Sequence, residues 1–333
     1  MEATNVQVLF FQHIKNSLPP HLSLVDEVAE VLNISNDSAY RRIRGEKAIA
    51  FEELQVLCSK YKISLDQFLH LQSDAFIFSG KLRTDSKNVF EDYLADVLNN
   101  FMYFNSFKKR HIYLLLKDIS PFIHFQVPEL ATFKFYLWMK SILHQDSLKG
   151  VKFSLDDPRY LPYVEASKKI INEYNKVPMT EIWNAESINS SLRQINFYRE
   201  AGLFKKKEEV GILYDKIEEL IDHIEKQAEL GVKFTLGTKP NSSSAEYRMF
   251  VNELILGDNT HLTELDDARI TFLNHSVLYF IGTKDERFNN AMFNNMENLM
   301  KKSTMISSVG EKERSTFFNQ LRDKINEYRA MLT

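Results

Sequence analysis

"VAEVLNISNDSAYRRIRGEK", residues 28–47, contains two short helical patterns separated by a turn of only three residues, "NIS". Drawn as a helix, the second pattern places Ala39 and Ile43 on one side, with Tyr40 at the edge of that side. Gly45 can end this helix in a left-handed conformation. The opposite side is polar and partly basic, and it carries Asp37, Ser38, Arg41 and Arg44. Two helices joined this tightly, the second of them basic outside, predict a helix-turn-helix.

The sequence on both sides of this stretch extends the pattern to five short helices within residues 1–72. Apolar residues recur at helical spacing, and Ser23 and Ser64 occupy the positions of helix caps. Ser64 and Gln67 also have the spacing of a capping box. The predicted helical segments are "TNVQVLFFQHIKNSL", "SLVDEVAEVLNIS", "NDSAYRRIR", "FEELQVLCSKYK" and "SLDQFLHL".

The run "VAEVLNISNDSAYRRIRGEKAIAFEELQVLCSKYKISLDQFL" resembles the DNA-binding domain of the lambda-repressor-like (Cro/repressor, or Xre) transcriptional regulators. The resemblance covers roughly residues 5–71. Its markers are "VLNIS" before the recognition helix, "RGEK" at the end of that helix, and "ISLDQFL" at the end of the domain. It implies a five-helix domain that binds double-stranded DNA with its second motif helix in the major groove.

Candidate DNA-binding residues follow from this resemblance, position by position. The residues that would face base edges are Asn36, Asp37, Tyr40 and Arg41. The residues that would contact backbone phosphate are Arg44 and Lys47. The same stretch completes the candidate set with Ser38 and Arg42.

The helix before the turn departs from the family pattern. Asp26, Glu27 and Glu30 make its outer face acidic, which should repel the DNA backbone that this helix normally crosses. An alternative therefore stays open, in which residues 41–47 are a solvated basic face. The chain would then be a helical protein-interaction scaffold whose N-terminal bundle does not bind DNA.

The bulk composition is that of an ordinary globular protein without a basic field. Hydrophobic residues make up 44% and charged residues 26% of the 333 residues, and the formal net charge is −3. Any affinity for nucleic acid must therefore come from a local patch. Cys58 is the single cysteine, which suits a reducing compartment. No signal peptide and no bilayer-spanning apolar run are evident, so we expect a cytoplasmic protein without a membrane partner.

The sequence lacks the common catalytic and metal-binding motifs. It has no Walker loop, no glycine-rich dinucleotide fingerprint, no HExxH, no CxxC pair and no G-x-S-x-G. The nine histidines are scattered singly, without the spacing of zinc ligands. We expect neither an enzyme nor a bound metal or cofactor.

Beyond residue 72 the chain is expected to remain mainly α, with a small α+β unit at its end. Residues 73–86 are polar and aperiodic, as in a linker. Residues 87–231 carry helical, aromatic patterns that predict a helical bundle or short solenoid, closed by Gly231 as a C-cap. In residues 232–333, the predicted strand segments "VKFTLG", "RMFVNELILG" and "ARITFLNHSVLYFIG" precede two helices.

Together these features predict a bacterial, sequence-specific DNA-binding transcriptional regulator with a C-terminal sensing or dimerisation region. A homodimer is expected because one helix-turn-helix buries too little surface for specific affinity by itself. The chain contains 25 Phe and 14 Tyr. In the helical middle region they either fill the core or leave a groove for a small apolar ligand or a peptide.

Overall fold

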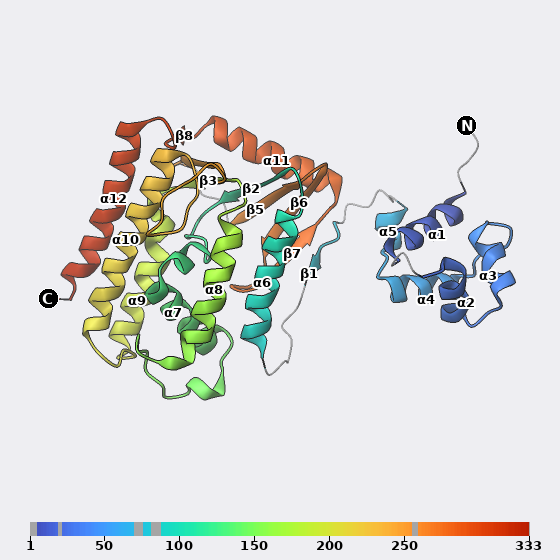
Figure 1. Cartoon of the computed structure of the whole chain (residues 1–333), viewed down its shortest axis with the longest axis horizontal. Coiled ribbons are helices and arrows are strands. Elements are labelled where there is room, and N and C mark those ends of the chain that lie inside the picture. Colours follow the sequence, from blue (N-terminus) through green and yellow to red (C-terminus); the bar gives the residue numbers. More distant parts are fainter. Residues whose placement is uncertain (1–4, 19–21, 70–75, 81–87, 255–258, 333) are drawn as a thin grey trace. The chain divides into compact units, whose positions relative to one another are not determined.

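The computed structural model describes residues 5–18, 22–69, 76–80, 88–254 and 259–332 (Figure 1). The chain forms two compact units, Met1–Ile77 (unit 1) and Phe78–Thr333 (unit 2). The expected linker, residues 73–86, lies outside the described residues except for 76–80. Each unit has a hydrophobic core of its own.

Unit 1 contains the five short helices that the sequence predicts. Their apolar faces meet in one core, centred on Phe11, Ile14 and Leu57, which have no exposed surface. The side chain of Ser23 caps α2 by accepting a hydrogen bond from the backbone N–H of Asp26 at 3.5 Å. The helices are α1 Val6–Ser17, α2 Leu24–Leu32, α3 Asn36–Ile43, α4 Phe51–Tyr61 and α5 Leu65–Phe68.

Unit 2 is built on an eight-stranded mixed sheet with the order β1-β7-β6-β5-β2-β3-β4-β8. β3 pairs in parallel with β2 on one side and with β4 on the other. All other pairings are antiparallel. The strands are β1 Ser79–Gly80, β2 Arg110–Leu115, β3 Met179–Trp183, β4 Tyr247–Val251, β5 Thr260–Leu265, β6 Ala268–Asn274, β7 Phe280–Thr283 and β8 Thr304–Met305.

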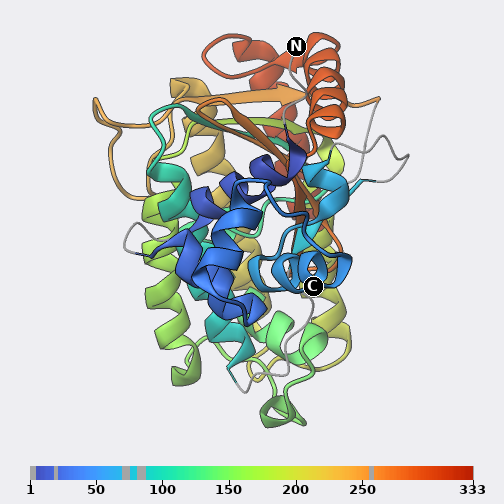
Figure 2. The same cartoon turned by 90° about the vertical axis from the view of Figure 1, so that its right-hand side faces the viewer.

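Helices cover both faces of this sheet (Figure 1, Figure 2). On one face α11 packs through Phe293 and Met296 onto Ile182 and Leu262. On the other face the large aromatic core joins the sheet to α6, α7, α8 and α10. The helices are α6 Val89–Asn105, α7 Pro128–Leu137, α8 Leu161–Tyr174, α9 Asn189–Glu200, α10 Glu208–Leu230, α11 Glu286–Lys301 and α12 Glu311–Ala330. Short 3₁₀ or π segments are Ile123–Gln126, Trp138–Ile142, Asp146–Leu148, Pro158–Tyr160 and Ala185–Ile188.

The expectation of a mainly α protein with a small α+β unit at the end is wrong, because the large mixed sheet makes unit 2 an α/β structure. Two of its central strands, β2 and β3, come from the middle region that was expected to be only helical. Parallel strands need long helical crossovers, so the helices of that region connect strands of the sheet. The segment "VKFTLG" is not a strand, and only Val232 forms a bridge, to Glu246.

Several local predictions are confirmed. Gly231 ends α10 with φ of 67°, in the left-handed conformation that favours glycine. The two helices predicted after the strand segments of residues 232–333 are present as α11 and α12, with the short strand β8 between them. A bilayer-crossing helix does not occur in the described part of the chain, since no helix there is both long and apolar enough.

Candidate nucleic-acid interface and internal cavity

The first candidate site is the pair α2 and α3 of unit 1. The turn between them starts with Asn33 in the left-handed conformation, with φ of 51°. The side chain of Ser35 then caps α3, accepting from the backbone N–H of Ser38 at 3.3 Å. Such a cap satisfies a donor that the first turn of a helix leaves free. The three-residue turn predicted from "NIS" is therefore confirmed.

A glutamine of α1 fixes the chain that leaves α3. The Gln7 side-chain amide donates to the carbonyl oxygens of Arg42 at 2.6 Å and Lys47 at 2.8 Å. Its own oxygen accepts from the backbone N–H of Ile49 at 3.0 Å. These bonds tie the loop after α3 to α1, so α3 is held at both ends.

Most of the predicted DNA-binding residues lie exposed on α3 or in the residues just after it. The exposed ones are Asn36, Asp37, Tyr40, Arg41, Arg44 and Lys47, and Ser38 is half-buried. The guanidinium of Arg44 lies over the ring of Tyr40, 5.6 Å from its centroid. Arg44 Nε also lies 3.2 Å from Glu46 Oε1. α3 thus presents basic side chains and an aromatic ring together.

Arg42 does not belong to that exposed surface, because only 5% of the residue is exposed. Its Nε donates to Glu53 Oε2 at 2.9 Å, and its Nη2 donates to Glu53 Oε1 at 2.6 Å. Its Nη1 donates to the carbonyl oxygen of Ser38 at 3.1 Å. Hydrogen bonding to Arg42 holds the pKa of Glu53 below its ordinary value. Arg42 therefore joins α3 to α4.

The acidic side chains of α2 are partly engaged within unit 1. Asp26 Oδ1 accepts from Asn36 Nδ2 at 2.9 Å, which links the acid to the start of α3. Glu27 accepts from the hydroxyl of Tyr61 at 3.5 Å, and burial together with this carboxylate raises the pKa of Tyr61. Glu30 is exposed. Two of the three acidic side chains of α2 that would repel DNA phosphate thus accept hydrogen bonds within unit 1.

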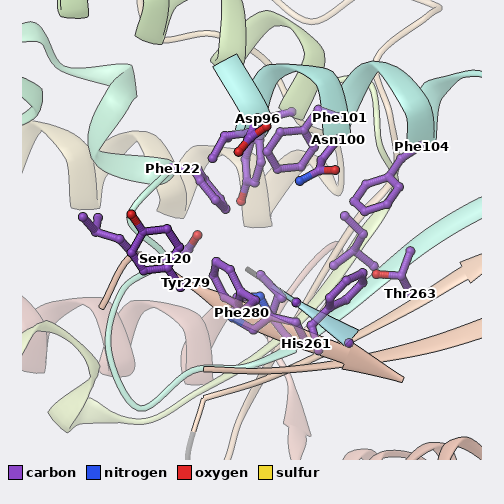
Figure 3. A pocket seen from close by; sticks show the side chains of 18 of the residues that line it. Asp96, Asn100, Phe101, Phe104, Ser120, Phe122, His261, Thr263, Tyr279 and Phe280 are labelled. Carbon is purple, nitrogen blue, oxygen red and sulfur yellow. The ribbon is translucent and has the colours of Figure 1, made fainter. Parts of the chain in front are cut away.

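The second candidate site is a cavity of about 310 Å³ inside unit 2 (Figure 3). It lies between α6 and the face of the sheet formed by β1, β2, β5, β6 and β7. Its wall is mainly aromatic: Tyr93, Phe101, Phe104, Phe122, Tyr174, Phe272, Tyr279 and Phe280. Gly282 belongs to this wall, and a Cβ there would stand 2.9 Å from Cε1 of Phe272. Glycine thus lets that ring lie against β7.

Several polar groups line the cavity. The hydroxyl of Ser120 is fully buried and unpaired. Tyr93 and Thr263, which are also buried residues, bring two further hydroxyl groups to the wall. Burial lowers the pKa of His261 to about 4, so this ring is neutral at pH 7. Figure 3 shows Ser120 and His261 on different sides of the space.

A buried acid accepts hydrogen bonds from aromatic side chains, one of them Tyr174 of the cavity wall at 3.4 Å. Glu181 has no exposed surface and accepts from Trp183 Nε1 at 2.8 Å and from the hydroxyl of Tyr247 at 2.7 Å. The ammonium of Lys233 donates to the carbonyl oxygen of Tyr174 at 2.6 Å. Burial raises the pKa of Glu181 and lowers the pKa of Lys233 to about 7. This network supports the ring of Tyr174, which lines the cavity.

A third polar cluster joins residues far apart in the sequence. Ser191 Oγ lies 2.9 Å from His124 Nε2 and accepts from Lys134 Nζ at 2.9 Å. All three residues are buried, and burial lowers the pKa of Lys134 to about 8. None of the three lines the cavity described above. These hydrogen bonds link α9 to α7, so the cluster stabilises the packing of the two helices.

No protein-family model matches the chain, and neither a search of curated proteins nor a search of solved structures finds a match. Among the described residues, no group of three His, Cys, Asp or Glu side chains stands in position to hold a metal ion.

Proposed function

We propose that the protein is a cytoplasmic, DNA-binding transcriptional regulator in which α3 enters the major groove and unit 2 supplies sensing or dimerisation. The observation that carries this proposal is the division of the arginines of α3. Arg41 and Arg44 are exposed on the outer surface, whereas Arg42 is bonded to Glu53 inside unit 1. The helix is thereby held rigidly while its basic side stays open to a partner.

Guanidinium groups on a short exposed helix suit a duplex chemically. Arginine can bind guanine in the major groove with two hydrogen bonds, or it can bind phosphate. The Arg44 guanidinium also contacts the face of the Tyr40 ring, which favours a fixed position for this cation. To bind a base edge, the Asn36 side chain has to give up its hydrogen bond to Asp26. The formal net charge of −3 means that attraction to DNA is confined to this patch.

The double substitution Arg41→Ala/Arg44→Ala tests the proposal. We expect duplex affinity to fall at least tenfold, because each arginine that neutralises a phosphate releases counterions. The slope of log affinity against log salt should also become shallower by about 1 to 2. Fluorescence anisotropy with a mixed-sequence duplex, repeated at several salt concentrations, measures both quantities.

A matched control is Lys15→Ala/Lys60→Ala, which removes the same charge from exposed positions at the far ends of α1 and α4. These lysines are two turns away from Gln7 and Glu53, the residues that hold α3. The control should keep most of the affinity. If wild type and both variants bind alike, or none binds, α3 does not read DNA and the interaction-scaffold alternative is favoured.

We propose further that the protein acts as a homodimer assembled through unit 2. A single module of this kind buries only about 600–1,000 Å² of surface on DNA, which seldom suffices for specific binding. Light scattering of the full chain and of residues 78–333 provides the test. We expect both to have the mass of a dimer at micromolar concentration, and a monomeric full chain would rule the dimer out.

A further inference from the structure

We infer that the cavity of unit 2 is a binding site for a small, neutral, ring-bearing molecule held by the hydroxyls of Tyr93 and Ser120. This inference deepens the sensing role that we propose for unit 2. It concerns a site inside one unit, and its test measures ligand binding without DNA.

The size and walls of the cavity define the ligand class. A volume of about 310 Å³ is at the lower end of the range of small-molecule sites, and is too small for a folded or extended peptide. The walls are rings that already contact one another edge to face, such as Phe101 and Phe122 at 5.2 Å. A planar ring entering this space can make the same edge-to-face contacts.

An unpaired hydroxyl is the feature that the hydrophobic core by itself does not explain. Buried polar groups are nearly always hydrogen-bonded, and one left without a partner costs about 1–3 kcal/mol. Ser120 is 1% exposed, and its buried hydroxyl has no partner among the described residues. Tyr93 is 5% exposed and brings a second hydroxyl to the same wall. Both residues line the cavity, from α6 and from the segment after β2. A ligand with a hydroxyl or carbonyl group supplies the partner that Ser120 lacks.

The charge of the ligand follows from the rest of the wall. No lysine or arginine is among the described residues that line the cavity, so an anion would find no counter-charge. His261 is neutral at pH 7 because burial lowers its pKa. The acid in the wall, Asp96, lies on α6 and is half-buried. An ionised ligand would lose hydration on entering the interior, and an anion would in addition meet the carboxyl of Asp96, so neutral molecules are preferred.

The experiment compares three probes of equal ring size with the full-length protein at pH 7: 2-naphthol, 2-naphthoate and 2-naphthylmethylammonium. Binding is followed by ligand-observed NMR and by the shift of the melting temperature. We expect 2-naphthol to bind and to raise the melting temperature by mass action. The anionic and cationic probes should bind at least tenfold more weakly.

Three substitutions assign the site. Val97→Trp places a ring in the cavity and should abolish binding of 2-naphthol. Tyr93→Phe and Ser120→Ala each remove one hydroxyl, and each should weaken binding about three- to tenfold without lowering the melting temperature of the free protein. Tyr160→Phe is the matched control, because the Tyr160 hydroxyl is also buried and unpaired but does not line the cavity.

The outcomes are distinct. If Val97→Trp does not fold, the hydroxyl variants and their control still decide the assignment. Equal binding of the three probes, equal effects of Tyr93→Phe and Tyr160→Phe, or no binding by the folded wild type overturns the inference. Retention of DNA binding by the same preparations, measured without probe, keeps failure of the cavity site separate from failure of DNA binding.

Discussion

Arg41 and Arg42 are neighbours in the chain, yet Arg41 reaches solvent and Arg42 is buried against Glu53. Successive residues of a helix point about 100° apart, and here that step turns Arg42 inward while Arg41 stays at the surface. Arg42 lies on the side of α3 that faces the core, and two parallel hydrogen bonds to Glu53 compensate for its burial. The planar fork of a guanidinium is suited to this geometry, whereas a lysine could make only a single contact.

The Arg42–Glu53 pair yields a prediction with a pH signature. Replacing Glu53 with Gln should lower the free energy of unfolding of residues 1–77 by about 1–3 kcal/mol at pH 7, since charge-assisted hydrogen bonds are lost. The pKa of Glu53 is lowered in the folded state, so the unfolded state binds more protons near that pKa. The contribution is therefore complete above the unfolded pKa and disappears as the pH falls through the folded one. Urea unfolding at pH 7 and pH 3 measures the contribution and its decline as the pH falls.

Glu52 provides the control for this substitution, because it is exposed and lies next to Glu53 on α4. Glu52→Gln should change the free energy of unfolding by less than about 0.5 kcal/mol at either pH. A destabilisation by Glu53→Gln that persists unchanged at pH 3 would show that packing, and not the ion pair, is responsible.

At the scale of elements, the helices of unit 1 were predictable because each carries its own local signals. Ser23 and the turn residue Asn33 mark the boundaries of α2 in sequence and in structure alike. The strands β2 and β3 were not predictable in this way. All five residues of β3 are buried, so it has no alternation of polar and apolar side chains to distinguish it from a buried helix. β1 and β8 have two residues each and carry no periodicity.

The two candidate sites also differ in how far local sequence signals predict them. The residues of α3 are contiguous, so a pattern within one helix was enough to name them, although not to show that Arg42 points inward. The cavity joins α6 to strands more than 150 residues later, through Phe104 and Phe272 among others. The pairings of β2 with β5 and of β1 with β7 bring those segments together. No local pattern in the sequence encodes those pairings.

At the scale of the whole molecule, the two units have separate hydrophobic cores and are joined by a single segment of chain. Unit 1 is small, and small domains bury a lower fraction of their surface and are less stable. We therefore expect two thermal transitions in calorimetry of the full chain, with unit 1 unfolding first.

A pair of substitutions checks this expectation. Leu57 in unit 1 and Leu321 in unit 2 have no exposed surface. Leu57→Ala should lower only the first transition and Leu321→Ala only the second, each by the equivalent of about 2–5 kcal/mol. A single transition that moves with either substitution would mean that the units unfold together.

The pairings of the sheet also determine when each unit can form as the chain is synthesised. Arg110 of β2 pairs with Leu265 of β5, and Gly80 of β1 pairs with Ile281 of β7. These partners leave the ribosome long after β1 and β2 do, whereas unit 1 is complete by Ile77. Contacts distant in sequence form slowly, and unpaired strands are prone to aggregate meanwhile. A nascent chain thus carries a finished unit 1 while β2 still lacks β5, and in this interval unit 2 is most exposed to aggregation.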